Sequence, residues 1–291
     1  MGVSLTMATQ IKTGDCTSVL KTLDANTFNT CVTSPPYWGL RDYGEDAQLG
    51  LEQTPEEYVE NMVKVFSEVK RVLRDDGTLW LNLGDSYYNY RPGKGQYVPK
   101  QTVSKTRQDL PMEVGRRANK LEGLKEKDLV GIPWRVAFAL QADGWYLRQD
   151  IIWNKPNPMP ESVRDRCTKS HEYIFLLSKN KKYYYDHEAI KEPTVNGTEW
   201  KNKRSVWNVS LKPYKEAHFA TYPPDLIEPC ILAGCPDNGQ VLDPFGGAGT
   251  TGMVAQRNNR NCTMIELNPE YADIADKRLQ NDTHLIQGEL L

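Results

Sequence analysis

The amino-acid sequence predicts an α/β protein in which a mostly parallel sheet is covered by helices on both faces. Short apolar segments typical of strands alternate with amphipathic segments typical of helices. One predicted strand ends in a double proline, and another runs into a glycine-rich turn that opens a helix. Parallel neighbours need long crossovers, usually helices, so this alternation favours a doubly covered parallel sheet.

The predicted elements follow one another through the chain without an internal repeat. In the first half they are strands at 11–15, 28–34 and 78–83 and helices at 17–23 and 54–74. In the second half they are helices at 132–142, 223–233, 250–257 and 269–279 and strands at 145–153, 171–178, 240–243 and 262–267. The longest helix is the most regular, because Thr54 and Glu57 form a capping box and Pro55 occupies its first turn.

Composition indicates a soluble globular protein. The 291 residues carry a net charge of −2, so any contact with nucleic acid must rely on local basic charge. The chain has no apolar run long enough to cross a membrane, and its first ten residues lack the pattern of a secretion signal. The six cysteines form no Cys-x-x-Cys pair and the four histidines do not cluster. We therefore expect no metal site and no disulfide framework, and we expect a cytoplasmic protein.

One segment is strongly basic. Between Arg91 and Lys127 the chain has ten Lys or Arg and four Asp or Glu, a net charge of +6, and four tyrosines lie at its front. We interpret residues 86–130 as an insertion that faces DNA and orders on its phosphates. The alternative is a solvated, mobile insertion without a partner.

The turn after the strand at 240–243 has the composition of a ligand-binding loop. Residues 241–252 read VLDPFGGAGTTG, and the glycines allow positive φ and close approach of a ligand to the backbone. Asp243 lies at the carboxyl end of its strand, where α/β sheets bind ligands, and the next helix offers free N–H groups. Glu266 ends the following strand, where an acid commonly binds ribose hydroxyls.

This turn differs from the phosphate-binding loops of two large nucleotide-binding classes. It has neither the Gly-x-Gly-x-x-Gly of dinucleotide sites nor the Gly-Lys-[Ser/Thr] of nucleoside triphosphatases. An acid at its start favours a cationic ligand over a pyrophosphate. With Asp243 and Glu266 both in place, the segment predicts a cofactor site.

The strand at 28–34 runs into a stiff loop with the sequence TSPPYW. Its two prolines cannot continue a helix or donate hydrogen bonds to a central sheet ladder. The loop therefore displays the hydroxyl of Ser34 and two rings, Tyr37 and Trp38. A plain proline-bearing turn with both rings in the core is the alternative.

TSPPYW and DPFGGAGTT together resemble the motifs of the amino-methylating DNA methyltransferases, which use S-adenosylmethionine. The order of the two motifs is similar to that of the permuted beta group, in which the catalytic loop precedes the glycine loop. The resemblance extends to residues 77–87, 151–179 and 216–234. It implies a Rossmann-like methyltransferase fold with a mostly parallel seven-stranded sheet.

The resemblance also assigns residues to the site. It implies a catalytic tetrapeptide made of Ser34, Pro35, Pro36 and Tyr37. It implies cofactor contacts near the adenine from Asp15 and Cys16, around the methionine from Asp243, Phe245, Gly247, Thr250 and His218, and on the ribose from Glu266. No metal is implied.

The chemistry of amine methylation explains why such a loop is rigid. An exocyclic amine is a poor nucleophile, because its lone pair is delocalised into the ring of the base. We hypothesise that Ser34 Oγ and the Pro35 carbonyl accept the amine hydrogens and hold the positive charge that develops. Tyr37 would stack on a base flipped out of the duplex, and Trp38 either extends that wall or packs in the core. No catalytic cysteine is needed.

The residue at position 34 bears on which base is methylated. By the resemblance, Ser favours the N4 amine of cytosine, whereas members acting on the N6 amine of adenine usually carry Asp or Asn, so adenine stays the alternative. Residues 179–215 occupy the usual place of target recognition and mix cations with rings, although a structural β-extension is also compatible. The catalytic and cofactor-binding domain then comprises 1–85, 131–178 and 216–291.

Two other functions compete with DNA methylation. An RNA or protein amide methyltransferase would usually carry Asn-Pro-Pro-Tyr after the glycine loop, which is the reverse of the order here. A catalytically silent DNA-binding protein would not need the intact set of Ser34, Tyr37, Asp243 and Glu266. Besides DNA, the resemblance allows a homodimer and a separately encoded restriction enzyme as partners, with no membrane contact.

Overall fold

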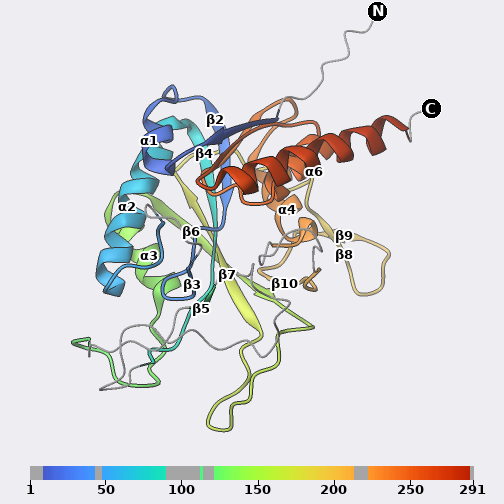
Figure 1. Cartoon of the computed structure of the whole chain (residues 1–291). Coiled ribbons are helices and arrows are strands. Elements are labelled where there is room, and N and C mark those ends of the chain that lie inside the picture. The colour runs from blue at the N-terminus through green and yellow to red at the C-terminus, as the bar shows by residue number, and fades with distance from the viewer. Residues whose placement is uncertain (1–8, 43–47, 90–111, 114–120, 213–221, 289–291) are drawn as a thin grey trace, which may run out of the picture.

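A computed structural model describes the chain except for residues 1–8, 43–47, 90–111, 114–120, 213–221 and 289–291. Its centre is an eight-stranded sheet with the order β1-β12-β11-β2-β4-β7-β6-β10 (Figure 1). In that order the strands are Thr9–Thr13, Asn261–Glu266, Gln240–Asp243, Phe28–Thr33, Leu73–Leu83, His171–Ser178, Tyr146–Asn154 and Val206–Asn208. The central sheet expected from the sequence is therefore present.

The sheet is parallel apart from one strand. β7 runs antiparallel to both of its neighbours, β4 and β6, while the other neighbouring pairs are parallel. The expected number of seven strands is one too few, because the three-residue strand β10 pairs with the edge of β6.

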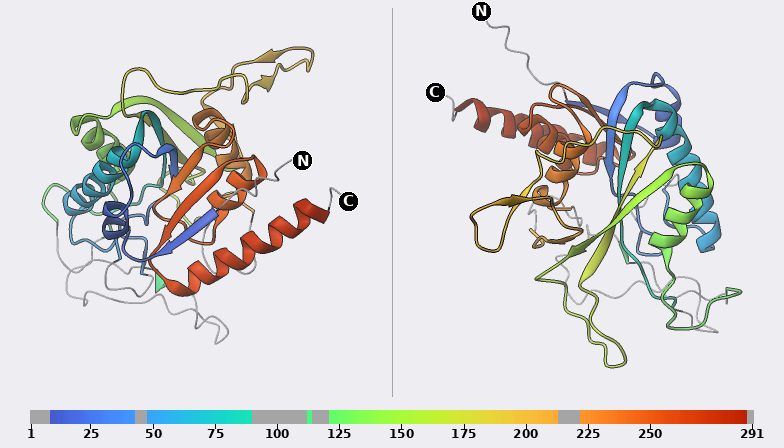
Figure 2. Two further views of the ribbon diagram at one scale, coloured as in Figure 1. Left: turned by 90° about the horizontal axis from the view of Figure 1, so that it is seen from above. Right: turned by 180° about the vertical axis from the view of Figure 1, so that it is seen from behind.

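Six helices of the described chain cover the two faces of the sheet (Figures 1 and 2). One face carries α1 to α3, which are Cys16–Lys21, Pro55–Val72 and Ile132–Ala142. The other carries α4 to α6, which are Pro224–Gly234, Thr250–Arg257 and Pro269–Gly288. Successive strand side chains point to opposite faces, so Leu79 and Leu81 enter the core under α1 to α3, while Trp80 enters the core under α4 to α6.

Helix α2 shows how local sequence sets an element. Thr54 Oγ1 accepts from the Glu57 N–H at 3.1 Å, and the Glu57 carboxylate accepts from the Thr54 N–H at 3.2 Å, so the capping box is formed. The helix ends at Val72 rather than at 74 as predicted. Leu73 is already extended and pairs with Phe28 as the first residue of β4, where its side chain is fully buried.

The carboxyl ends of three neighbouring strands meet at one edge of the sheet. β11 pairs with β2 on one side and with β12 on the other. The double-proline loop leaves β2, the glycine turn leaves β11, and Glu266 ends β12. Parallel pairing therefore brings together segments that lie more than two hundred residues apart.

Residues 86–130 and 179–215, for which the sequence predicted no helix or strand, are only partly described. In the basic insertion, the two-residue strand β5 (Met112–Glu113) pairs with β3 (Arg41–Asp42), and most of the rest lies outside the described residues. In 179–215, a small hairpin formed by β8 (Glu192–Pro193) and β9 (Trp200–Lys201) projects beside the sheet (Figure 2).

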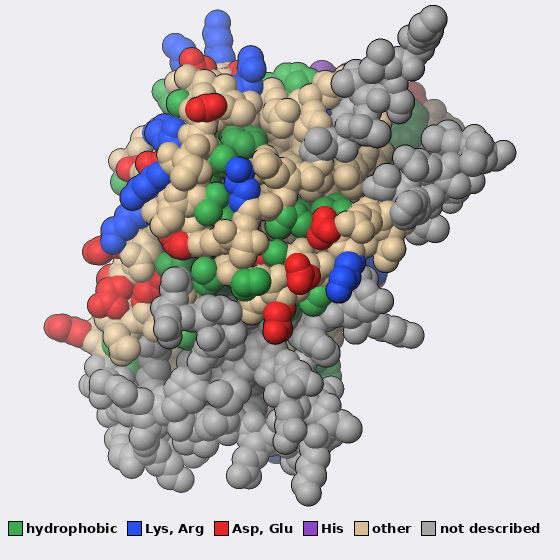
Figure 3. Space-filling view, turned by 45° about the horizontal axis from the view of Figure 1, so that its top comes forward, with side chains coloured by type: hydrophobic (Ala, Val, Ile, Leu, Met, Phe, Trp, Pro, Cys, Tyr) green, Lys and Arg blue, Asp and Glu red, His purple; other side chains and the backbone are tan. Residues whose placement is uncertain are grey.

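Charges of both signs are mixed on the surface. In the view of Figure 3, Lys and Arg side chains along the left edge are interleaved with Asp and Glu. Among the described residues, no helix is both long and apolar enough to cross a membrane, and no three His, Cys, Asp or Glu side chains gather in a way that could hold a metal ion.

Candidate active site

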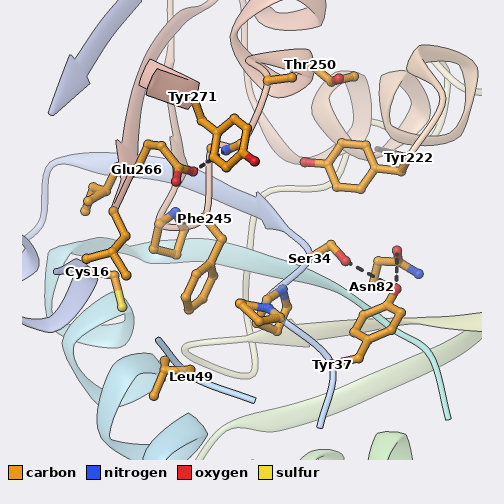
Figure 4. A pocket seen from close by; sticks show the side chains of 18 of the residues that line it. Cys16, Ser34, Tyr37, Leu49, Asn82, Tyr222, Phe245, Thr250, Glu266 and Tyr271 are labelled. Carbon is orange, nitrogen blue, oxygen red and sulfur yellow. Dashed lines mark hydrogen bonds between the residues drawn. The ribbon is translucent and has the colours of Figure 1, made fainter. Parts of the chain in front are cut away.

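A cavity of about 400 Å³ opens at the sheet edge where β2, β11 and β12 end (Figure 4). Its walls come from both of the motifs singled out in the sequence. Ten of the twelve predicted site residues line it: Asp15, Cys16, Ser34, Pro35, Pro36, Tyr37, Phe245, Gly247, Thr250 and Glu266. Asp243 does not line it, and His218 lies outside the described residues.

The glycine turn is closed by backbone hydrogen bonds and leaves room for a ligand. Gly246 N–H donates to Ile265 O at 2.8 Å, and an added Cβ at Gly246 would lie 2.9 Å from the Cβ of Met264. Gly247 has a φ of +49°, and an added Cβ there would meet no atom within 4 Å. Gly246 is thus needed for packing inside the protein, whereas Gly247 leaves open space at the cavity.

Glu266 fastens the turn to the neighbouring strand. Its carboxylate accepts from the N–H groups of Gly247 at 2.8 Å and Asn268 at 3.0 Å. Burial raises the pKa of the Glu266 carboxyl, while these two hydrogen bonds act in the opposite direction. Glu266 lines the cavity, and each of its oxygens has a further lone pair that a ligand hydroxyl can use.

Asp243 supports the site from beneath. It is 1% exposed, and it accepts hydrogen bonds from Thr33 Oγ1 at 2.6 Å, from the Phe245 N–H and Tyr222 OH at 3.0 Å each, and from Thr251 Oγ1. Burial raises the pKa of this carboxyl, and the hydrogen bonds partly offset that effect. Both oxygens of Asp243 are thus engaged in joining β2 to the glycine turn, and its predicted ligand contact stays a prediction.

The first turn of α1 forms another wall. Asp15 is the N-cap of this helix and accepts from the Ser18 N–H at 2.8 Å. This cap explains why β1 ends at Thr13, two residues before the predicted end. Cys16 is buried, which raises the pKa of its thiol to about 12, so it lines the cavity as a small neutral side chain.

The proline loop is held at several points. The Pro36 carbonyl accepts from the Tyr58 hydroxyl of α2 at 2.9 Å. Tyr37 OH lies 3.0 Å from Asn82 Oδ1 and 2.8 Å from Glu172 Oε2, and Ser34 Oγ lies 3.3 Å from the same hydroxyl. Figure 4 shows Ser34 and Tyr37 on one side of the cavity, with Phe245, Cys16 and Glu266 on the other.

The structure decides between the two interpretations of Trp38. This side chain is 3% exposed, and its indole N–H donates to the Glu52 carbonyl at 3.1 Å. It belongs to the core under α1 to α3 and does not line the cavity. Of the two rings in the TSPPYW loop, only the partly buried Tyr37 therefore lines the cavity.

Four polar residues around this cavity were not among the predicted site residues, although Lys155 was considered as a DNA contact and Tyr222 lies in the stretch 218–224 that the resemblance places near the methionine. Asn82, Lys155, Glu172 and Tyr222 all line it. Each lies in a segment that carries the family resemblance. A further signal was available for Asn82 and Glu172, because Asn82 interrupts the apolar run 79–83 of β4 and Glu172 directly precedes the apolar run 173–177 of β7.

Comparisons with known proteins agree with this geometry. The sequence profile of a family described as DNA methylase, covering N6 and N4 enzymes, matches residues 28–277. Type II methyltransferase M.Cfr9I of Citrobacter freundii is 54% identical over 275 residues, which are 94% of this chain and 89% of that protein. Type II methyltransferase M.SmaI of Serratia marcescens is 53% identical over 271 residues, 93% of this chain and 90% of that protein.

Solved structures share the fold. The cytosine-N4-specific PvuII DNA methyltransferase superposes with a TM-score of 0.68 at 20% identity, covering 94% of this chain and 86% of that one. A DNA modification methylase of Thermus thermophilus, in complex with S-adenosyl-L-methionine, gives a TM-score of 0.62 at 22% identity, covering 94% and 95%. The fold is therefore the Rossmann-like methyltransferase fold, and from the profile match and the close relatives we conclude that this chain belongs to the N6/N4 DNA methylase family.

Proposed function

We propose that this DNA methylase is a Type II methyltransferase that transfers the methyl group of S-adenosylmethionine to the N4 amine of a cytosine flipped out of DNA. The observation that carries the proposal is the single cavity that joins the Ser34 loop to the glycine turn. A methyl group can pass directly between two ligands only if both occupy one enclosed space. The catalytic loop precedes the glycine loop, which supports placement in the permuted beta group.

The residues of the cavity fit S-adenosylmethionine, which supplies an electrophilic sulfonium methyl group when bound. Glu266 would accept hydrogen bonds from the ribose hydroxyls, and the walls formed by Asp15 and Cys16 would flank the adenine. Phe245, Gly247 and Thr250 would surround the methionine, with the open space at Gly247 allowing close approach. His218 stays a proposed contact on that side.

The proline loop would then prepare the target amine. Ser34 Oγ and the Pro35 carbonyl would accept its two hydrogens, which favours a tetrahedral nitrogen and stabilises the charge that develops in attack. Tyr37 would stack on the extruded base. The prolines and the Tyr58 hydrogen bond hold the loop in place before the substrate arrives, so little reorganisation is needed.

The rest of the chain would serve DNA binding. We propose that 86–130 contacts phosphates and that 179–215 reads the target, with 1–85, 131–178 and 216–291 forming the catalytic domain. Trp200, which is 69% exposed at the tip region of 179–215, is available to a partner. The names of the relatives support a separately encoded restriction enzyme in the same system, and a homodimer is a further proposed partner. Free cysteines suit a cytoplasmic setting.

Methylation of unmodified genomic DNA by the purified chain tests this proposal. Nucleoside analysis should find N4-methylcytosine, and modification-sensitive sequencing should place it in one short context. Ser34 and the fold shared with the cytosine-N4-specific PvuII enzyme support cytosine. Detection of N6-methyladenine would replace cytosine by adenine. Transfer only to RNA, or cofactor binding without transfer, would overturn the proposal.

The Tyr37 ring lies against Gly84, which gives a prediction on activity. A Cβ added at Gly84 would lie 2.5 Å from Cε2 of Tyr37, so Gly84→Ala must displace the ring. We expect a single-turnover rate about 10-fold lower or more, because a small misplacement of a positioning group is costly. Cofactor affinity, measured by calorimetry, should not change. An unaltered rate would show that the ring position is unimportant.

The raised pKa of Glu266 predicts a pH dependence of cofactor binding. Ribose hydroxyls donate to the ionised carboxylate, so affinity should fall as the pH is lowered through this pKa, at a higher pH than for an ordinary Glu. Without cofactor the sign is opposite: the folded chain holds this proton more tightly than the unfolded chain, so the contribution of Glu266 to stability declines as the pH rises.

Calorimetric titration at several pH values checks this prediction. Glu266→Gln should bind about 10-fold more weakly at neutral pH, because the charged acceptor is lost. The difference in affinity between wild type and this variant should narrow at low pH. Because both proteins are measured at each pH, the titration of the cofactor itself cancels from this difference. A difference that stays constant with pH would contradict the assignment.

A further inference from the structure

A chain of hydrogen bonds leads away from Ser34 into the wall of the cavity. Ser34 Oγ lies 3.3 Å from Tyr37 OH, which lies 2.8 Å from Glu172 Oε2. The other oxygen of Glu172 accepts from Lys155 Nζ. Both side chains of this ion pair are 15% exposed, so solvent screens the pair only weakly.

The direction of these hydrogen bonds is fixed by the number of hydrogens available. Tyr37 has one hydroxyl hydrogen, and two acceptors compete for it, Glu172 Oε2 and Asn82 Oδ1 at 3.0 Å. The orientation of the Asn82 amide is set by its NH₂ group, which donates to Glu172 Oε2 at 3.3 Å and to the Tyr173 carbonyl at 3.0 Å. Tyr37 therefore donates inward in either case.

Ser34 completes this chain. Because the hydrogen of Tyr37 is engaged, its oxygen can only accept, and the hydroxyl hydrogen of Ser34 points to it. What Ser34 Oγ can offer to the cavity is then a lone pair. Burial and the neighbouring Glu172 charge both raise the pKa of Tyr37, which keeps the phenol protonated and able to donate.

We propose that Glu172, held by Lys155, is a positioning residue that acts through Tyr37 to make Ser34 an obligatory hydrogen-bond acceptor. The proposal rests on the proposed function and deepens it. An obligatory acceptor binds an amine on the target base and repels a carbonyl oxygen at the same position. Glu172 thereby contributes to choosing cytosine over uracil, or adenine over hypoxanthine if adenine is the target.

Glu172→Gln tests the chain, because an amide can donate to Tyr37 and so allow the whole sequence of hydrogen bonds to reverse. Binding is measured by competition between two duplexes that differ only in cytosine or uracil at the target position found by sequencing. We expect the preference for cytosine to fall about 10-fold, together with the single-turnover rate. Tyr37→Phe, which removes the link, should lower the preference similarly.

The double variant Tyr37→Phe/Glu172→Gln distinguishes a connected chain of hydrogen bonds from two independent effects. If Glu172 acts through Tyr37, the double variant should be no worse than the poorer single variant. Effects that multiply, or a cytosine preference that stays intact in both single variants, would overturn the proposal. If Glu172→Gln proves unstable in thermal unfolding, Tyr37→Phe alone still tests the chain of hydrogen bonds, because an intact cytosine preference in that variant overturns the proposal.

A matched control variant completes the design. Glu68→Gln changes a carboxylate that pairs with Arg71 at 2.8 Å on α2, outside the cavity and outside the segments proposed to bind DNA, and it should leave both the rate and the base preference unchanged. Wild-type protein that methylates no amine in DNA would refute the proposed function. Wild-type transfer combined with multiplying effects would refute only the role of Glu172.

Discussion

Ser34→Ala is expected to lower the rate of methyl transfer by about 10²- to 10³-fold, the usual cost of removing one preorganised group that stabilises developing charge. Ser34 Oγ lines the cavity beside Tyr37, and alanine leaves the target amine with one acceptor fewer. Single-turnover assays with tritiated cofactor measure the rate. Cofactor affinity should change little, because the proposed cofactor contacts lie on the opposite side of the cavity.

Ser34→Thr is the matched control. It keeps the hydroxyl and adds one methyl group, so it should retain much more activity than the alanine variant. Full turnover by Ser34→Ala would end the idea that this oxygen accepts from the amine. Equal losses in the two variants would mean that shape rather than hydrogen bonding matters at this position.

Asp243→Ala is expected to reduce the free energy of unfolding by about 3 kcal/mol and to abolish cofactor binding. The change leaves four donors without their acceptor beneath the cavity: the hydroxyls of Thr33, Tyr222 and Thr251 and the N–H of Phe245. It also releases the glycine turn from the end of β2. Urea denaturation measures the first effect and calorimetry the second.

Asp243→Asn distinguishes this structural role from a direct ligand contact. The hydroxyls of Tyr222 and Thr251 can rotate and accept from the new NH₂ group, so most hydrogen bonds survive. We expect the Asn variant to lose little stability and to retain cofactor binding. A stable Asn variant that has lost cofactor affinity would restore the contact that the sequence suggested.

Local sequence was sufficient for most elements. The helix at 132–142 and the strands at 171–178 and 240–243 have the predicted bounds, because turn residues and apolar periodicity mark their ends. The predicted ends of helices and strands were wrong where a contact with a residue distant in sequence set them. Leu73 leaves its helix to pair with Phe28, and β10 joins the sheet only because the edge of β6 is free to receive it.

The site was predictable to the extent that its motifs are continuous in sequence. TSPPYW and the glycine turn could be read directly, and the cavity brings their side chains together. The structural role of Asp243 could not be predicted, because a sequence does not show that a hydroxyl from another strand donates to its carboxylate. Glu172 was passed over for the same reason, because its contact with Tyr37 spans 135 residues.

By itself, the sequence determined the α/β class, the stiff proline loop and the glycine turn, because these follow from the conformations open to each short stretch of chain. Tertiary structure alone decided that the two loops form one cavity. Parallel pairing of β2 with β11 places their carboxyl ends side by side, and the Thr33–Asp243 hydrogen bond of 2.6 Å fastens them across 210 residues. Such a contact depends on strand order, which no local pattern encodes.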